Sequence, residues 1–424
     1  MCLIGFVTLN LFQGLKIKEM LKRVQHDVRF FLFLCTPVVI TNFSQAQTLT
    51  FTEVEKTSYR LYTEQKWDSL IDYVHEANKT GIDYYYLQAR LGSALYEKKN
   101  YRSAAFTFQN ALKYNSSDIY AKNSLYYSLL NSGNTTASRY LSSKSEYIKN
   151  STDKLKYNRM GFIYVEGGVK ICNKQEPLGN INYFNLGLQH SLGRRITFYH
   201  ALSFLGQTKH FQQIKQTGYY LGAWIQLGAN WKVCPSAHFF WINVSEQTET
   251  PPGPPRPPLS SSKSNEQAFS LVLQRSFRIF DMGAMASYNN FDAVKAGQFG
   301  GYATLYPFGN NVFSTTTTLV YHTRKMSAYQ TILKETVNLK MLKFLWLSGE
   351  FAYGNEQVML QPEAAFPANN SLDPNNYRYS ILLTSPVSKS FSLYGFYQHE
   401  DKNENITNVS YKFNSIIFGL KIKL

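Results

Sequence analysis

Residues 217–227 read Thr217-Gly218-Tyr219-Tyr220-Leu221-Gly222-Ala223-Trp224-Ile225-Gln226-Leu227, and their alternation decides the fold. From Tyr219 onward every second residue is apolar, whereas the residues between them are mostly polar, amphipathic or small. A period of two predicts a β-strand with one apolar face and one wetted face. The same alternation returns at 182–189 and 377–384 and continues to the last residue. Residues 159–424 are therefore expected to be all β.

Fourteen segments with this period can be counted. We expect strands at 160–170, 181–191, 195–207, 217–227, 232–246, 266–276, 279–291, 298–308, 311–323, 327–339, 343–354, 376–386, 390–400 and 408–424. Tight turns such as 192–194 and 309–310 separate longer loops such as 247–265 and 355–375. Outer-membrane barrels have short periplasmic turns and long external loops. The pattern predicts an antiparallel up-and-down transmembrane barrel of about 14 strands, whose two ends lie on the short-turn side.

The composition fits a membrane barrel. Charged residues make up 17% of the 424 residues and aromatic residues 16%, whereas soluble domains carry roughly 25% charged residues. A sheet that crosses a membrane must close on itself and needs aromatic belts at both interfaces, which accounts for the aromatic excess. The net charge of +16 comes from scattered Lys and Arg. We therefore expect contact with outer-membrane lipid and no binding of nucleic acid.

A second periodicity, of about 34 residues, governs the segment before the barrel. At this offset Trp67, Leu70, Val74 and Ala77 align with Tyr101, Ala104, Phe108 and Ala111. With Leu91-Gly92 upstream, the pattern resembles the tetratricopeptide repeat. The resemblance implies antiparallel helix pairs over 47–150, followed by a linker at 151–158. It also implies a concave surface that binds a periplasmic protein or peptide.

Four tyrosines of the repeat segment are candidates for partner contacts on that surface: Tyr84, Tyr85, Tyr120 and Tyr127. The alternative is that these rings pack between helices. Residues 131–153, rich in Ser, Thr, Asn and Gly, are expected to form a connecting segment that contains a frayed helix.

The first 46 residues are expected to direct export. A basic flank at Arg29 precedes an apolar run over 30–40, and small residues lead up to Ala46. This layout predicts a signal peptide cleaved after Ala46, with a start site set too far upstream as one explanation for residues 1–21. An uncleaved anchor is the alternative.

A repeat domain placed before a barrel resembles the tetratricopeptide-repeat-containing outer-membrane barrel proteins of the YaiO-like type. The resemblance implies an outer-membrane location with both termini in the periplasm and the long loops outside the cell. The function expected is that of a component of an envelope assembly or export system. The alternatives are a channel or transporter for small solutes, an outer-membrane hydrolase and a soluble β-propeller.

The residues expected to line the barrel interior are Glu166, Trp224, Arg275, Glu350 and Arg378. They either pair with one another to fill the interior or form a polar conduction path. No catalytic residue, metal ligand or cofactor site is assigned, because the histidines are scattered and the four cysteines are dispersed. The sequence is therefore expected to be that of a protein that is not an enzyme, and its partner and oligomeric state stay open.

Overall fold

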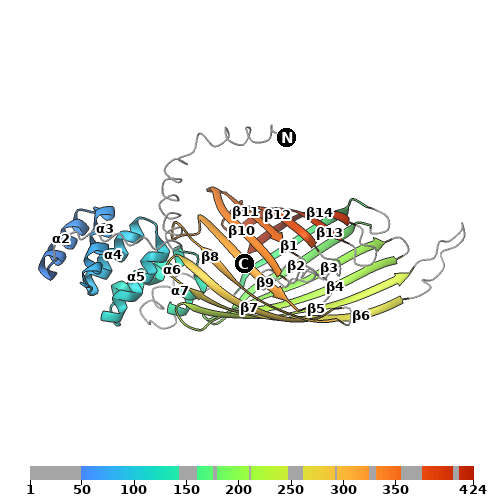
Figure 1. Cartoon of the computed structure of the whole chain (residues 1–424), viewed down its shortest axis with the longest axis horizontal. Helices are drawn as coiled ribbons and strands as arrows, with labels where there is room; N and C mark the ends of the chain where they lie inside the picture. Colours follow the sequence, from blue (N-terminus) through green and yellow to red (C-terminus); the bar gives the residue numbers. More distant parts are fainter. Residues whose placement is uncertain are drawn as a thin grey trace, which may run out of the picture.

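The computed structural model describes residues 49–142, 160–174, 179–209, 212–246, 261–291, 294–323, 331–354, 375–403 and 410–424. Within these residues, six helices precede a closed antiparallel barrel of 14 strands, which confirms the fold class predicted from the sequence (Figure 1). The expected signal peptide (1–46) and linker (151–158) lie outside the described residues.

The helices form three successive pairs, here called the helical module. They are α2 (Phe51–Thr63), α3 (Trp67–Lys79), α4 (Tyr85–Glu97), α5 (Tyr101–Tyr114), α6 (Ile119–Asn131) and α7 (Thr135–Ser142). The first helices of the pairs begin at residues 51, 85 and 119, and the second helices at 67, 101 and 135. Every step equals the repeat period seen in the sequence. No helix in the described part of the chain is long and apolar enough to cross a membrane.

The turn inside each pair is also repeated. Gln65, Lys99 and Gly133 have positive φ angles of 54°, 61° and 81°, and each is one repeat period from the next. At the centre of the module Phe108 is buried against Gly92, where a Cβ would stand 2.8 Å from the ring. The small residue therefore lets α4 and α5 cross closely, as the aligned sequence pattern requires.

Helix α7 lies in the segment 131–153, which was expected to connect the two parts of the chain and to contain a frayed helix. Residues Thr135–Ser142 form a helix whose Ala137 is fully buried in the core of the module. Its sequence is mostly polar, so packing against α6 stabilises it more than helix propensity does. The third pair is therefore a complete helical hairpin.

The barrel strands occupy nearly the expected positions. They are β1 (Met160–Cys172), β2 (Ile181–Leu192), β3 (Ile196–Lys209), β4 (Gln212–Gln226), β5 (Trp231–Glu246), β6 (Ser261–Ser276), β7 (Phe280–Phe291), β8 (Val294–Leu305), β9 (Phe313–His322), β10 (Thr331–Leu342), β11 (Leu345–Tyr353), β12 (Asn375–Pro386), β13 (Phe391–Asn403) and β14 (Ser410–Lys423). Each strand pairs with its neighbours in the chain, and β1 pairs with β14 to close the barrel. Strands β4 and β6 begin five residues earlier than expected, in polar stretches that show no alternation.

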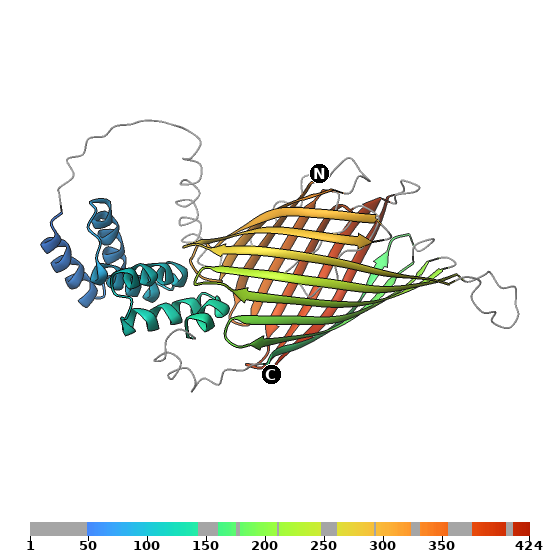
Figure 2. The ribbon, with the colours of Figure 1, turned by 90° about the horizontal axis from the view of Figure 1, so that it is seen from below.

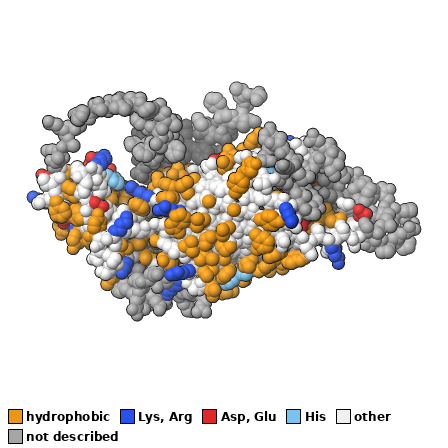
Figure 3. All heavy atoms as spheres, turned by 60° about the horizontal axis from the view of Figure 1, so that its bottom comes forward, with side chains coloured by type: hydrophobic (Ala, Val, Ile, Leu, Met, Phe, Trp, Pro, Cys, Tyr) orange, Lys and Arg blue, Asp and Glu red, His pale blue; other side chains and the backbone are white. Residues whose placement is uncertain are grey.

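The outer wall of the barrel is apolar. On β2, Leu186 is 43% exposed and points outward, and on β14 Phe418 is 69% exposed. Apolar side chains cover much of the barrel in the view of Figure 3. Inward-facing positions are mostly polar, aromatic or small, with a few buried aliphatic residues such as Val272 and Ile332, so the strands have the two faces predicted from their period of two.

Tyrosine rings fill the inner wall above glycines on the adjacent strand. Tyr394 pairs with Gly419, Tyr164 with Gly187, and Tyr302 with Gly283. A Cβ at any of these glycines would overlap the opposite ring. The glycines are therefore sites of close packing rather than flexible points.

The helical module and the C-terminus lie at the same end of the barrel (Figures 1 and 2). Leu424 donates its backbone N–H to Gly161 at the start of β1 (3.3 Å), and Lys423 donates to Ser390 in a short turn (2.7 Å). This is the end with the short turns, at 193–195, 227–230, 277–279, 306–312, 343–344 and 387–390, here called the rim. The even number of strands places both ends of the barrel there.

We expect Gly419→Ala to lower the stability of the barrel by about 1–3 kcal/mol, because the added methyl displaces the Tyr394 ring. The matched control is Gly206→Ala on β3, where a Cβ would meet no atom within 4 Å. The temperature at which the folded band is lost on a semi-native gel measures the difference. Equal transitions for the two variants would contradict the packing role of the tyrosine.

Candidate functional site

The helical module is fixed to the rim by a buried ion pair. Arg102, in the first turn of α5, reaches Asp281 at the start of β7, and their side chains are only 7% and 9% exposed. The Arg102 guanidinium also lies over the Tyr306 ring, 3.9 Å from its centroid, while the Tyr306 hydroxyl donates to Asp281 at 3.2 Å. The backbone N–H of Arg102 donates to the Gly309 carbonyl at 2.8 Å. An N–H at the start of a helix, which has no partner within the helix, is thus satisfied by the barrel.

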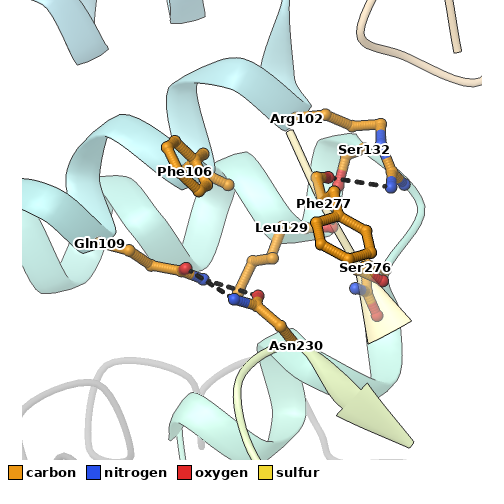
Figure 4. Close-up of a pocket in the computed structure, with 10 residues that line it drawn as sticks. Arg102, Phe106, Gln109, Leu129, Ser132, Asn230, Ser276 and Phe277 are labelled. Atoms are coloured by element: carbon orange, nitrogen blue, oxygen red, sulfur yellow. Dashed lines mark hydrogen bonds between the residues drawn. The ribbon is translucent and has the colours of Figure 1, made fainter. Parts of the chain in front are cut away.

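Further contacts extend this interface to four of the six short turns. Figure 4 shows the Gln109 and Asn230 amides facing each other, with two hydrogen bonds of 3.1 Å. From α7, Ser142 accepts from Arg194 at 2.7 Å and Arg139 donates to Ser191 at 3.0 Å. Barrel contacts thus come from α5, α7 and the turns before them.

The first helices of the pairs carry exposed tyrosines. Tyr86 on α4 is 61% exposed and Tyr120 on α6 is 49% exposed, and the two are one period apart. Tyr59 on α2 (57%) and Tyr127 on α6 (44%) are two periods apart. Equivalent positions of successive repeats share one surface. These four residues are here called the tyrosine face.

The tyrosine face is built on a cross-repeat ion pair. Arg90 of α4 donates to Glu55 of α2 at 2.6 and 3.0 Å, and its guanidinium lies 5.3 Å from the Tyr59 ring centroid and 5.8 Å from that of Tyr86. Hydrogen bonding from Arg90 lowers the pKa of the Glu55 carboxyl. Arg90 is nearly buried, and its guanidinium is hydrogen-bonded to Glu55. It therefore holds the rings of Tyr59 and Tyr86 in place.

The four tyrosines predicted from the sequence as partner contacts lie in two different environments. Tyr120 and Tyr127 lie on the tyrosine face. Tyr84 and Tyr85 are half-buried against the core of the module, and the Tyr84 hydroxyl donates to Glu55 at 2.6 Å. Burial raises the pKa of Tyr84 to about 12. The sequence analysis missed Tyr59 and Tyr86, although whole repeat periods relate them to Tyr127 and Tyr120 in the sequence.

Four of the five residues expected to line the interior do point inward. Glu166 is 2% exposed and accepts from Tyr183 (2.7 Å), Asn185 (2.9 Å) and Tyr394 (2.6 Å). Glu350 accepts from Arg378 at 2.7 Å. Trp224 is buried on the inner wall. The described contacts of these carboxylates are with inward-facing donors.

Arg275 was wrongly assigned to the interior. It shares the outward face of β6 with Leu271 and Leu273 and is itself exposed. Its guanidinium lies 5.2 Å from the Trp231 ring centroid and 4.9 Å from that of Phe277. An arginine beside aromatic rings at the end of a strand suits the membrane interface, where its charge reaches water.

Among the described residues, no group of three or more His, Cys, Asp or Glu side chains is arranged to hold a metal ion. The structure does bring two histidines together: His190 and His200 stack with ring centroids 5.0 Å apart on the outer wall. His322 is buried and faces the interior.

These features define the class: a transmembrane antiparallel β-barrel with an α-helical module docked on its short-turn rim. No protein-family model and no curated protein matches the chain. Among solved structures, the barrel is similar to the CymD monoaromatic hydrocarbon channel, with a TM-score of 0.44, 9% identity, and coverage of 63% of this chain and 90% of that one.

Two further similar structures are an outer-membrane protein and a toluene transporter. The outer membrane protein Omp33 of Acinetobacter baumannii has a TM-score of 0.37 and 9% identity, covering 63% of this chain and all of that one. The toluene transporter TodX of Pseudomonas putida has a TM-score of 0.38 and 10% identity, covering 64% and 91%. At such identities the likeness concerns the barrel fold.

Arg102→Gln is expected to loosen the docking of the module, because it leaves the Asp281 carboxylate buried without its partner. Breaking a buried pair costs about 3 kcal/mol or more, which corresponds to roughly 100-fold faster opening. Hydrogen exchange at residues 101–103 and 306–311 measures this opening. Lys113→Gln, an exposed change on the same helix, serves as control, and unchanged exchange in Arg102→Gln would refute the role of the pair.

The Glu55–Arg90 pair predicts a dependence of module stability on pH. Because the folded-state pKa of Glu55 is lowered, its contribution is present above the unfolded value of about 4.3 and is lost as the pH falls through the folded value. Glu55→Gln should therefore be less stable than the native chain at pH 7, and the difference should shrink below about pH 4. Denaturation followed by helical circular dichroism tests this, with Glu97→Gln as control. A difference independent of pH would count against the pair.

Proposed function

We propose that this protein is an outer-membrane β-barrel whose helical module is a tetratricopeptide-like domain that lies in the periplasm and binds a protein or peptide partner. The observation that carries the proposal is the division of labour between the helices of each pair. The second helices α5 and α7 hold the module on the rim, and the first helices present the tyrosine face. Such a module holds a partner at a constant position relative to the barrel.

The location is supported by the solvent requirements of the barrel. A closed sheet with an apolar outer wall suits hydrocarbon, and outer-membrane barrels keep their short turns in the periplasm. The module sits on the short-turn rim, so this orientation puts it and the C-terminus in the periplasm. The signal peptide expected at 1–46 would provide the export that this requires.

The tetratricopeptide identity is supported by the constant spacing of the helix starts and of the positive-φ turns, which matches the repeat period of that family. It is also supported by the contact of Phe108 with Gly92 at the crossing of α4 and α5. Stacked helical pairs of this kind offer extended surfaces for peptide binding. Exposed tyrosines supply large contact area at low entropic cost, which favours a role in binding without chemistry.

Site-specific photo-crosslinking in cells tests this proposal. A photoreactive phenylalanine analogue at Tyr86 or Tyr120 should give discrete crosslinked products, and Tyr86→Ala combined with Tyr127→Ala should abolish the product at Tyr120. The matched control site is Tyr114, which is 52% exposed and lies at the end of α5, a second helix of its pair. Equal products at Tyr114, or none at Tyr86 and Tyr120, would refute the proposal.

The second candidate function is passage of a small solute through the barrel. It is favoured by the inward rows of polar and charged side chains, among them the Glu350–Arg378 pair. Reconstitution into planar bilayers tests it: a conduit gives discrete conductance steps, and a barrel indistinguishable from bare lipid removes this function. Native barrel folding is checked on the same sample by heat-dependent gel mobility.

A further inference from the structure

Three lysines stand on the inner wall close to the rim. Lys232 is the second residue of β5, Lys340 is two residues before the last residue of β10, and Lys421 is two before the last residue of β14. Each lysine is an even number of residues from a buried, inward-facing residue of the same strand, so it also points inward. These buried residues are Cys234 on β5, Ile332 on β10 and Ser415 on β14. The three side chains therefore lie in one layer at the short-turn mouth of the barrel.

Each ammonium group rests on an aromatic ring of the neighbouring strand. Lys232 lies 4.1 Å from the Trp224 ring centroid, Lys340 lies 5.3 Å from that of Trp346, and Lys421 lies 3.6 Å from that of Phe162. The ring faces hold the cations by their negative quadrupole but accept no full hydrogen bond. The N–H donors of an ammonium group held this way remain open to an acceptor in the lumen.

The lysines deeper in the barrel are held differently. Lys334 pairs with Glu350 at 3.5 Å, and Lys170 pairs with Glu400 at 2.5 Å. Each of these lysines therefore faces a carboxylate, and Glu350 is shared between Lys334 and Arg378. Among the described ion pairs, none involves the three lysines of the mouth.

The acidic side chain that could have neutralised this layer, Asp281, is paired with Arg102 of the helical module. Among the four described residues of each strand nearest the rim, Asp281 is the one Asp or Glu. It is bound to Arg102 of α5, so the pair adds no net charge to the mouth. The layer is left with three positive charges facing the lumen.

We propose that Lys232, Lys340 and Lys421 form a lysine ring that binds small anionic solutes, with carboxylate or phosphate groups, at the short-turn mouth. Rings of Lys or Arg are the arrangement by which pores select anions. The low-dielectric wall focuses the field of the three charges into the lumen and raises the local anion concentration. This proposal goes beyond the binding of a partner by the helical module. It does not require that the barrel conduct solutes, except for the measurement of ion selectivity, which rests on the second candidate function.

Tryptophan fluorescence tests the ring without requiring conduction. Trp224 and Trp346 lie beneath two of the lysines, and replacing Trp67, Trp231 and Trp241 by Phe leaves them as the reporters. Iodide is the anionic probe and acrylamide the neutral one. We expect Lys232→Met, Lys340→Met and Lys421→Met together to lower iodide quenching by about threefold or more, with acrylamide quenching unchanged.

The matched control replaces Lys343 and Lys389 by Met, because these lysines lie in short turns outside the strands and test general attraction of anions by the rim. It should leave iodide quenching close to the native value. Equal iodide quenching in the native and the triple variant, both showing heat-dependent gel mobility, would overturn the ring.

Reversal potentials in a KCl gradient give the second measurement. The native barrel should prefer chloride, and the triple lysine variant should lose that preference. If the barrel does not conduct but iodide quenching falls in the variant, the conduit fails and the ring stands. If the barrel conducts with the same reversal potential in both proteins and iodide quenching is also equal, the conduit stands and the ring fails.

Discussion

A sheet in hydrocarbon can leave no backbone edge unpaired, and the rest of this structure depends on that constraint. The pairing of β1 with β14, from Phe162 opposite Lys423 to Cys172 opposite Phe413, removes the last free edge. Closure then fixes which residues face lipid and which face the interior. Apolar rows, inward charges and tyrosine rings above glycines all follow from this single condition.

Closure with an even number of strands has a consequence for the soluble part. Both ends of the barrel fall on the short-turn rim, so a domain that precedes β1 meets turns rather than long loops. Short turns offer a firm surface, and the module uses four of them through Arg102, Gln109 and α7. The tyrosine face is left exposed on the first helices of the pairs. The lysine ring lies on the inner wall within three residues of the same rim, so both candidate sites are positioned by the rim.

The sequence predicts the strands well because lipid imposes a uniform rule on every outward position. Prediction fails where that rule stops: the first residues of β4 and β6 are polar on both faces, and Arg275 lies where the wall meets water. On the module, a one-residue step around a helix separates half-buried Tyr85 from exposed Tyr86. A helical period alone does not decide which of two adjacent tyrosines is buried, because tertiary packing decides it. The residues of the interface with the rim likewise form no recognisable pattern in the sequence.

The Arg102–Asp281 pair joins residues 179 positions apart in the chain, and this implies an order of assembly. Contacts within the module link neighbouring repeats, whereas closure links β1 to β14 across the whole barrel. Local contacts form faster than distant ones, so the module completes its fold first. Arg102 is then a hydrated cation until β6 and β7 form the turn that offers Asp281. Docking of the module thus requires the four turns between β2 and β9 that it contacts, and a barrel that lacks them carries a folded but unattached domain.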